Sequence, residues 1–342
     1  MTDDLFRGGP VVVAAKEAGS GALLTALLAA QSQLPRIVAL VEAPADRYFD
    51  KLGIEVERIT RGASGVWAVD VERVLAAVAP VRIIVGASAG ATIEKELIDA
   101  GARHRIPVVA MVDHYWNLWQ RFAGATPRDR WRYRPDVIYV PDDKCVARLK
   151  ELECPVADIR SFRHPHLAAA PDRRTPEFRR AGRERLGLSQ DDAVILFISE
   201  YVFADDEGWQ WDQPTDSDIE ESGQELAAIA ADLSGGGQSV RLLVRPHPSE
   251  RRDWEAIFAA RGGHAVIDRS LDKPTLFSVA DVAVGLNSML LAEAAEAGVP
   301  AYCRFPSGAY AGPKLSDFRR AIVELKTPQD CRAAIRNICK IA

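Results

Sequence analysis

The sequence lacks the cysteine pattern of a disulfide framework or of a zinc site. Its cysteines are few and scattered, with no CxxC pair: Cys145, Cys154, Cys303, Cys331 and Cys339. An odd count at such wide spacing argues against paired bridges and against a four-ligand zinc cage. We therefore expect reduced thiols and no metal site.

Long apolar runs are also missing. No stretch approaches the roughly 20 apolar residues that span a bilayer, and the N-terminal MTDDLFRGGP has no apolar core of a signal peptide. These absences predict a cytoplasmic protein without a transmembrane segment. Peripheral contact with a membrane stays open.

The chain has little excess charge and no complete nucleotide-binding fingerprint. The net charge of -5 argues against a nucleic-acid binder, which needs a basic surface to neutralise phosphates. Neither a full GxGxxG nor a GxxxxGK[ST] segment occurs. We therefore discount NAD and ATP as cofactors.

What the sequence does contain is a regular alternation of short apolar runs with helical patterns. The runs lie at 10–15, 36–41, 54–59, 81–85, 107–112 and 136–140, and again at 193–199, 240–244, 264–267 and 282–284. Such runs separated by helices are typical of a parallel sheet covered on both faces. The predicted fold class is α/β, with two Rossmann-like domains facing across a cleft.

The length of 342 residues suits two domains rather than one core. We predict an N-terminal domain over 1–168 and a linker over 169–190, where Pro, Arg and Ala accumulate. A C-terminal domain follows over 191–327, and a last helix over 328–342.

The most informative segment is VAVGLNSMLLAEAAEAGVP at 282–300. An apolar run, a tight turn and a helix start place unpaired N–H groups and the helix dipole at one point, which favours an anion. Asn287 and Ser288 are candidate phosphate ligands there. Glu293, further along the helix, is a candidate for both hydroxyls of a ribose, unless it faces solvent and Glu296 is the polar partner.

RPHPSE at 245–250 follows another apolar run. Pro246 and Pro248 stiffen the loop around His247 and fix the direction of its ring. His247 and Arg245 are therefore candidate phosphate ligands. The alternative is a rigid turn with a surface histidine.

Small-residue loops follow two strands of the N-terminal half. The predicted turn at 18–21 contains Gly19 and Ser20, and the loop at 86–90 contains Ser88. Such loops let a ligand approach the backbone, although they serve equally as structural turns.

The segment DHYWN at 113–117 directly follows a predicted strand. Trp116 offers an aromatic face for a sugar, and Asp113 or His114 would take a proton from an acceptor hydroxyl. The alternative is an aromatic lid that packs the core, with Asp113 as a helix cap.

Other polar groups carry weaker predictions. Glu200 and Asp206, after the run at 193–199, are reserve bases of the cleft. Asp142 precedes a helical pattern, so we interpret it as an N-cap rather than a metal ligand. His164 and His166 have no third ligand in view.

The two C-terminal motifs together resemble the GT-B glycosyltransferase superfamily and the non-hydrolysing UDP-N-acetylglucosamine 2-epimerases, most strongly over 240–300. The His-Pro pair after a strand is similar to bacterial sialyltransferases, Kdo transferases and CDP-glycerol transferases, all of which use cytidine nucleotides. By this resemblance His247 and Ser288 contact the donor phosphate and Glu293 the ribose. It also implies that 1–168 is the acceptor-binding domain and 191–327 the nucleotide-sugar-binding domain. The Asp206-Glu207-Gly208 triplet resembles an acidic sialyltransferase motif, which that family carries in its N-terminal domain.

The resemblance implies a metal-independent glycosyltransferase of surface polysaccharide biosynthesis. It would move a sugar, such as a nonulosonic acid or Kdo-like unit, or a polyol phosphate from a nucleotide donor to a carbohydrate or glycoprotein acceptor. CMP- or CDP-linked donors are favoured, UDP-linked donors are the alternative, and no cofactor is tightly bound. Two other functions stay open: a sugar-nucleotide epimerase or hydrolase, with acids around the sugar, and a non-catalytic nucleotide-sugar-binding protein.

Overall fold

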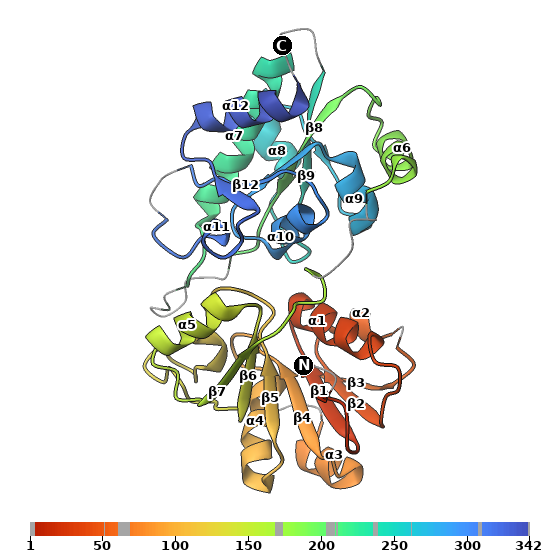
Figure 1. Cartoon of the computed structure of the whole chain (residues 1–342), viewed down its shortest axis with the longest axis vertical. Helices are drawn as coiled ribbons and strands as arrows, with labels where there is room; N and C mark the ends of the chain where they lie inside the picture. Colours follow the sequence, from red (N-terminus) through yellow and green to blue (C-terminus); the bar gives the residue numbers. More distant parts are fainter. Residues whose placement is uncertain are drawn as a thin grey trace. The chain divides into compact units, whose positions relative to one another are not determined.

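A computed structural model divides the chain into two compact units (Figure 1). Unit 1 comprises Met1–His166 and Asp205–Trp211, and unit 2 comprises Leu167–Ala204 and Asp212–Ala342. The structure describes residues 4–50, 52–60, 69–167, 174–202, 209, 211–234, 239–260, 262–306 and 310–340. The predicted site residue Asp206 lies outside these ranges.

Unit 1 is built on a parallel seven-stranded sheet with the order β3-β2-β1-β4-β5-β6-β7. Its elements in chain order are β1 (Val11–Ala15), α1 (Ala18–Ala29), β2 (Ile37–Val41), α2 (Asp46–Phe49), β3 (Glu55–Arg58), α3 (Val71–Val78), β4 (Arg82–Gly86), α4 (Ile93–His104), β5 (Val108–Met111), η1 (Gln120–Phe122), β6 (Val137–Val140), α5 (Asp143–Glu151) and β7 (Asp158–Ser161). Every residue of β1 and β2 is buried. Full burial explains why these strands are unbroken apolar runs, because helices cover both faces of such a sheet.

Unit 2 repeats this plan with a parallel six-stranded sheet in the order β10-β9-β8-β11-β12-β13. Its elements are α6 (Pro176–Arg185), β8 (Ala193–Ile198), α7 (Asp216–Ser234), β9 (Val240–Arg245), α8 (Trp254–Ala259), β10 (Val266–Ile267), α9 (Lys273–Val279), β11 (Val282–Gly285), α10 (Met289–Glu296), β12 (Ala301–Cys303), α11 (Leu315–Phe318), β13 (Ile322–Glu324) and α12 (Pro328–Cys339). In Figure 1, α7 and α12 lie on one face of this sheet, and α6 and α9 on the other. The predicted doubly wound α/β class is confirmed for both units.

Both sheets have a topological switch point, where successive connections leave in opposite directions. In unit 1 it lies between β1 and β4, and in unit 2 between β8 and β11. Open α/β sheets bind ligands outside the carboxyl ends of the strands at such a point. The residues that follow these four strands are therefore the first places to look for a site.

The predicted turn at 18–21 is wrong, because helix α1 already begins at Ala18. Its glycines serve close packing instead. A Cβ built on Gly19 would lie 1.8 Å from Oδ2 of Asp113, and one on Gly21 would lie 2.9 Å from Ala45. Tertiary contact, and not turn geometry, requires glycine in this first helical turn.

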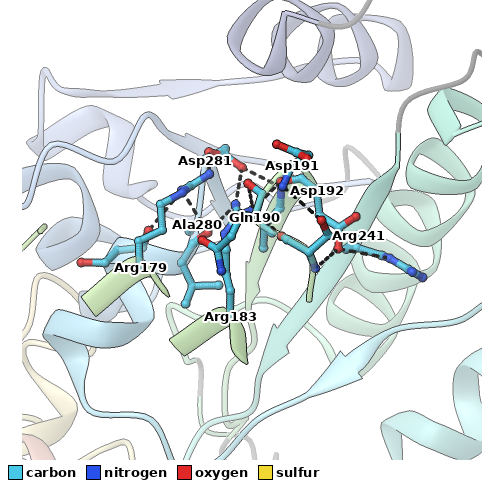
Figure 2. A network of polar contacts seen from close by, with 12 residues as sticks. Arg179, Arg183, Gln190, Asp191, Asp192, Arg241, Ala280 and Asp281 are labelled. Carbon is cyan, nitrogen blue, oxygen red and sulfur yellow. Dashed lines mark hydrogen bonds and ion pairs between the residues drawn. The ribbon is translucent and has the colours of Figure 1, made fainter. Parts of the chain in front are cut away.

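Helix α6 lies within the predicted linker at 169–190 but packs as part of unit 2. Figure 2 shows Arg179 and Arg183 of α6 pointing at Asp281, with distances of 2.9 and 3.0 Å. The fully buried Arg183 also donates to four backbone carbonyls, those of Ser189, Gln190, Asp192 and Val279. Asp281 in turn accepts from the N–H of Val194, so the network ties α6 to the starts of β8 and β11.

An aromatic stack in unit 1 includes residues from far along the sequence. Trp119 stacks on Trp209 with ring centroids 5.7 Å apart, and Trp209 stacks on Trp211 at 5.4 Å. The guanidinium of Arg130 lies 4.7 Å from the Trp119 ring centroid. Offset stacking and a cation over the indole face both stabilise such an arrangement.

Candidate functional site

The carboxyl edge of the unit 2 sheet gathers most of the predicted donor ligands. Strands β9, β8 and β11 are neighbours, and they end before Pro246, Ser199 and Leu286. The loops that carry His247, Glu200 and Ser288 therefore leave the sheet side by side. His247 follows β9 and Ser288 follows β11, the two strands on either side of β8. At the usual spacing of parallel strands, β9 and β11 are about 10 Å apart.

Glu250 holds the RPHPSE loop in place. One of its carboxylate oxygens accepts from Ser199 Oγ at 2.8 Å, from Trp254 Nε1 at 2.9 Å and from Arg252 at 2.6 Å. The other oxygen accepts from the backbone N–H of His247 at 2.9 Å. Glu250 is 6% exposed, so this buried carboxylate fixes the loop to β8 and α8.

These contacts determine the state of His247. Its Nδ1 accepts from the N–H of Ser249 at 3.1 Å, so Nε2 carries the proton of the neutral ring and is a donor. The ring stacks on Tyr201 with centroids 5.9 Å apart. Arg245, two residues earlier, donates from Nη1 to Asp268 at 2.7 Å.

The turn after β11 is tied down by Asn287, which is fully buried. Its amide nitrogen donates to Tyr310 Oη at 3.0 Å and to Pro313 O at 3.2 Å, and its amide oxygen accepts from the N–H of Leu315 at 2.9 Å. The side chain of Asn287 thus joins the turn to the start of α11. Ser288 is the N-cap of α10, and its Oγ accepts from Leu290 N at 3.3 Å.

Glu200 lies at the switch point itself. Its carboxylate accepts from the backbone N–H of Asn287, and the residue is 8% exposed. Burial raises its pKa to about 8, against the lowering effect of the N–H groups of Asn287 and Ser288. A carboxyl that is largely protonated at neutral pH therefore faces the N-terminus of α10.

Glu293, the predicted ribose ligand, lies on α10 and is 5% exposed. Both of its carboxylate oxygens accept from Lys273 Nζ, at 2.8 and 2.6 Å. Lys273 begins α9, so this ion pair joins the two helices that flank β11. No local pattern around Glu293 indicates this partner.

In unit 1, Asp113 lies after β5 and is paired with Arg121. Arg121 Nη1 donates to Asp113 Oδ1 at 3.0 Å and also to the backbone oxygen of Ala87. Both partners are less than a tenth exposed. The carboxylate also contacts Gly19 at the start of α1, so it joins the ends of β5, β4 and β1.

Two further carboxyls lie at the unit 1 switch point. Glu94 accepts from Ser88 N at 3.0 Å, Ser88 Oγ at 2.9 Å and Lys16 N at 3.2 Å. Burial first, and the charge of Glu17 next, raise its pKa to about 8. The pKa of Glu17 is also raised by burial, against the lowering effect of Arg121.

The predicted cleft residues around this point are largely buried. Ser20 and Ser88 are each 1% exposed, with their Oγ atoms 3.5 Å apart. Trp116 is 5% exposed and meets the His114 ring edge-on at 4.0 Å, which leaves little of its face for a sugar. Gly19 is exposed.

One pocket of ≈ 240 Å³ lies at the opposite edge of the unit 2 sheet. Arg179, Asp192, Asp281 and Lys340 contribute to its polar lining, around the network of Figure 2. It adjoins the amino ends of β8 and β11. Because parallel α/β sheets bind ligands at the carboxyl ends, we place the candidate site at the other edge.

The described ranges contain no group of three His, Cys, Asp or Glu side chains that could hold a metal ion. Asp142 is the N-cap of α5, as predicted, and accepts from Cys145 N at 3.0 Å. Among the described helices none has the length and apolar character needed to cross a membrane.

Comparison with known proteins yields structural neighbours only. No protein-family model matches the chain. No curated protein matches its sequence significantly.

Several solved structures, however, share its architecture over nearly the whole chain. UDP-GlcNAc 2-epimerase from Neisseria meningitidis, bound to UDP-GlcNAc, is 10% identical with a TM-score of 0.61, over 97% of this chain and 94% of that one. The wall teichoic acid polymerase TagF, soaked with CDPG, is 12% identical with a TM-score of 0.56, over 97% and 79%. The E. coli ADP-heptose LPS heptosyltransferase II is 13% identical with a TM-score of 0.53, over 97% and 99%.

The chain has the GT-B fold. Its two Rossmann-like sheets and this full-length similarity show that architecture, which the two C-terminal motifs had indicated. At these identities the similarity shows the fold alone.

Four residues of the two sites escaped the sequence reasoning. Glu17 follows β1, and Glu94 is the second residue of α4. Glu250 ends the RPHPSE loop, and Lys273 begins α9. Glu17 had a signal, because it is the second residue after a buried strand. The burial of Glu94 and the pairing of Lys273 depend on tertiary contacts that no local pattern contains.

Proposed function

We propose that the chain is a GT-B enzyme that acts on a nucleotide-activated sugar or polyol phosphate. One observation carries the proposal: the loops after β9, β8 and β11 meet at a switch point and bring His247 to the same edge as the N-terminus of α10. Solved neighbours of the same fold carry UDP-GlcNAc or were soaked with CDPG.

The chemistry required is stabilisation of a leaving phosphate. Departure of the nucleotide leaves negative charge on its phosphate, and fixed donors aimed at that charge lower the barrier. His247 would donate from Nε2, Arg245 from its guanidinium, and α10 from its first N–H groups. In this proposal no metal ion takes part.

The donor we favour is cytidine-linked, because RPHPSE resembles the His-Pro element of enzymes that use cytidine nucleotides. The acceptor would be a surface carbohydrate or a glycoprotein. We assign the proton acceptor for its hydroxyl to unit 1, to Asp113 or His114. Asp113 is already paired with Arg121, which makes its carboxylate a weaker base. Glu17 is therefore a third candidate, because burial raises its pKa and makes it a stronger base.

A binding panel tests the proposal. Wild type is titrated calorimetrically with CMP, CDP, UDP and GDP, and then compared with His247→Ala. We expect a cytidine nucleotide to bind most tightly and His247→Ala to weaken it at least tenfold. The exposed His264→Ala is the matched control. If no nucleotide binds wild type, the proposal fails.

One observation favours a second function, a sugar-nucleotide epimerase or hydrolase. Unit 1 holds three carboxyls, Glu17, Glu94 and Asp113, at its own switch point. Acid–base chemistry on the sugar ring needs carboxyls of this kind, and burial raises the pKa of both Glu17 and Glu94. One of the solved neighbours is a UDP-GlcNAc 2-epimerase.

The two functions differ in what happens without an acceptor. An epimerase or hydrolase changes UDP-GlcNAc alone, which ¹H NMR of the anomeric region detects. Glu17→Gln would abolish that change, whereas the exposed Glu96→Gln would not. A transferase requires an added acceptor, and a non-catalytic binding protein leaves the donor intact in both conditions.

A further inference from the structure

The backbone amides of Asn287 and Ser288, next to the N-terminus of α10, already have a carboxyl partner within the protein. The N–H of Asn287 donates to the carboxylate of Glu200, and the N–H of Ser288 also hydrogen-bonds to it. These N–H groups lie immediately before α10, an eight-residue helix whose dipole favours negative charge at this end. The Glu200 side chain therefore lies where we place the donor phosphate.

Glu200 is buried, and within the described ranges no cation is paired with its carboxylate. Arg252 donates from Nη1 to the backbone oxygen of Glu200 at 2.9 Å, while its guanidinium pairs with the carboxylates of Glu250, Asp216 and Glu220. The other ionisable groups that act on this pocket are Glu250, Tyr310 and Cys303. None of these three carries a positive charge.

The protonation state of Glu200 follows from these surroundings. Burial raises its pKa to about 8, the two backbone N–H groups lower it, and the charge of Glu250 raises it again. Arg252 makes the smallest of these contributions and lowers it. At neutral pH the carboxyl is mostly neutral, so it is a weak acceptor and does not repel an anion. At pH 9 it is ionised, holds both N–H groups more strongly and repels phosphate.

We propose that Glu200 is an internal occupant of the phosphate-binding amides, which the donor phosphate displaces. The inference rests on the proposed function, because it assumes that a nucleotide phosphate binds at Asn287 and Ser288. It makes the site sensitive to pH: ionised Glu200 competes with the ligand and neutral Glu200 does not. The glutamate thereby sets the pH range in which the donor binds.

The test compares wild type with Glu200→Gln, which keeps an amide oxygen to accept from the N–H groups but cannot ionise. Binding of CDP and UDP is measured by calorimetry at pH 7 and pH 9. One-proton linkage predicts that wild-type affinity falls about tenfold over this interval. The affinity of Glu200→Gln should change less than about twofold.

The matched control is Glu255→Gln, which removes an exposed carboxylate from the first turn of α8 in the same unit. It should keep the wild-type pH slope. Because each ligand is compared between variants at the same pH, any titration of the nucleotide itself cancels.

Three outcomes separate the two proposals. Equal slopes in wild type and Glu200→Gln overturn the role of Glu200 and leave the nucleotide site standing. Absence of binding by both proteins at both pH values overturns both proposals. A steep wild-type slope that Glu200→Gln abolishes supports both.

A second measurement uses the ligand-free wild-type protein, so it does not depend on whether Glu200→Gln folds. In the ligand-free protein the ¹H–¹⁵N resonance of the Asn287 amide should titrate between pH 7 and 9, as the carboxyl that it contacts ionises. A resonance that stays constant over this range overturns the proposal. Where Glu200→Gln folds, its Asn287 resonance should stay constant.

Discussion

Glu94 in unit 1 allows a prediction of stability whose sign changes with pH. Its carboxylate accepts from Ser88 twice and from Lys16 once, and it is 1% exposed. Glu94→Gln keeps the shape and one acceptor oxygen but removes the charge. The new amide group cannot accept from the N–H of Lys16, so the variant loses about 1 kcal/mol at pH 5.

The magnitude at higher pH follows from linkage. The pKa of Glu94 rises from 4.5 to about 8, so the folded state holds this proton more tightly than the unfolded chain. The stability it contributes is complete below pH 4.5 and is lost as the pH rises to 8. At 1.36 kcal/mol per pKa unit the loss reaches about 5 kcal/mol. Glu94→Gln has no such loss, so it should be the more stable protein at pH 9.

Urea unfolding of wild type and variant at pH 5, 7 and 9, followed by circular dichroism, measures this difference. Two units predict two transitions, and only that of unit 1 should respond. Glu96→Gln, exposed two residues further along α4, is the matched control and should follow wild type. Parallel stability curves for wild type and Glu94→Gln would refute the reasoning.

Three further predictions concern other parts of the chain. His247→Ala should cut turnover of a nucleotide-sugar donor by about 10–100-fold in a coupled nucleotide-release assay, with His264→Ala unchanged; equal loss in both variants would contradict this. Arg183→Lys should lower the free energy of unfolding of unit 2 by about 3 kcal/mol in urea titrations, because a lysine cannot reach the same five acceptors. The exposed Arg180→Lys should change it little, and equal effects of the two substitutions would exclude the network as the cause. Native thiols should react slowly with Ellman's reagent at pH 8, because burial raises the pKa of Cys339 to about 11 and that of Cys303 and Cys331 to about 12; fast labelling of those last two would disprove their burial.

The strands were predictable where they are buried on both faces. β1 and β8 are unbroken apolar runs, and the structure places strands there within a residue or two. Two of the edge strands, β3 and β10, fall within the predicted runs at 54–59 and 264–267, whereas the edge strand β7 was missed. Its sequence, DIRS, carries charge toward solvent and contains no apolar run. The start of α1 was missed because a glycine in a sequence indicates either a turn or a close packing contact. At Gly19 it is the contact with Asp113 that requires glycine, and the local sequence does not contain this information.

The candidate site was predictable as a location rather than as a set of contacts. Apolar runs that end in polar loops locate the carboxyl edge, which gave Arg245, His247 and Ser288. Partners come from strands that are neighbours only in the folded sheet. Asp268 for Arg245, Lys273 for Glu293 and the Asn287 amide for Glu200 are of this kind.

The stack of Trp119 on Trp209 bears on how this protein can be dissected. A cut after His166 would follow the first boundary between the two units. It would nevertheless place Trp119 and Trp209, which stack within unit 1, in different polypeptides. The shorter fragment would expose the face of Trp119, and the longer one would carry Trp209 without its stacking partner Trp119. Recombining the fragments should quench or shift indole emission, so the protein has a built-in optical signal for reassembly.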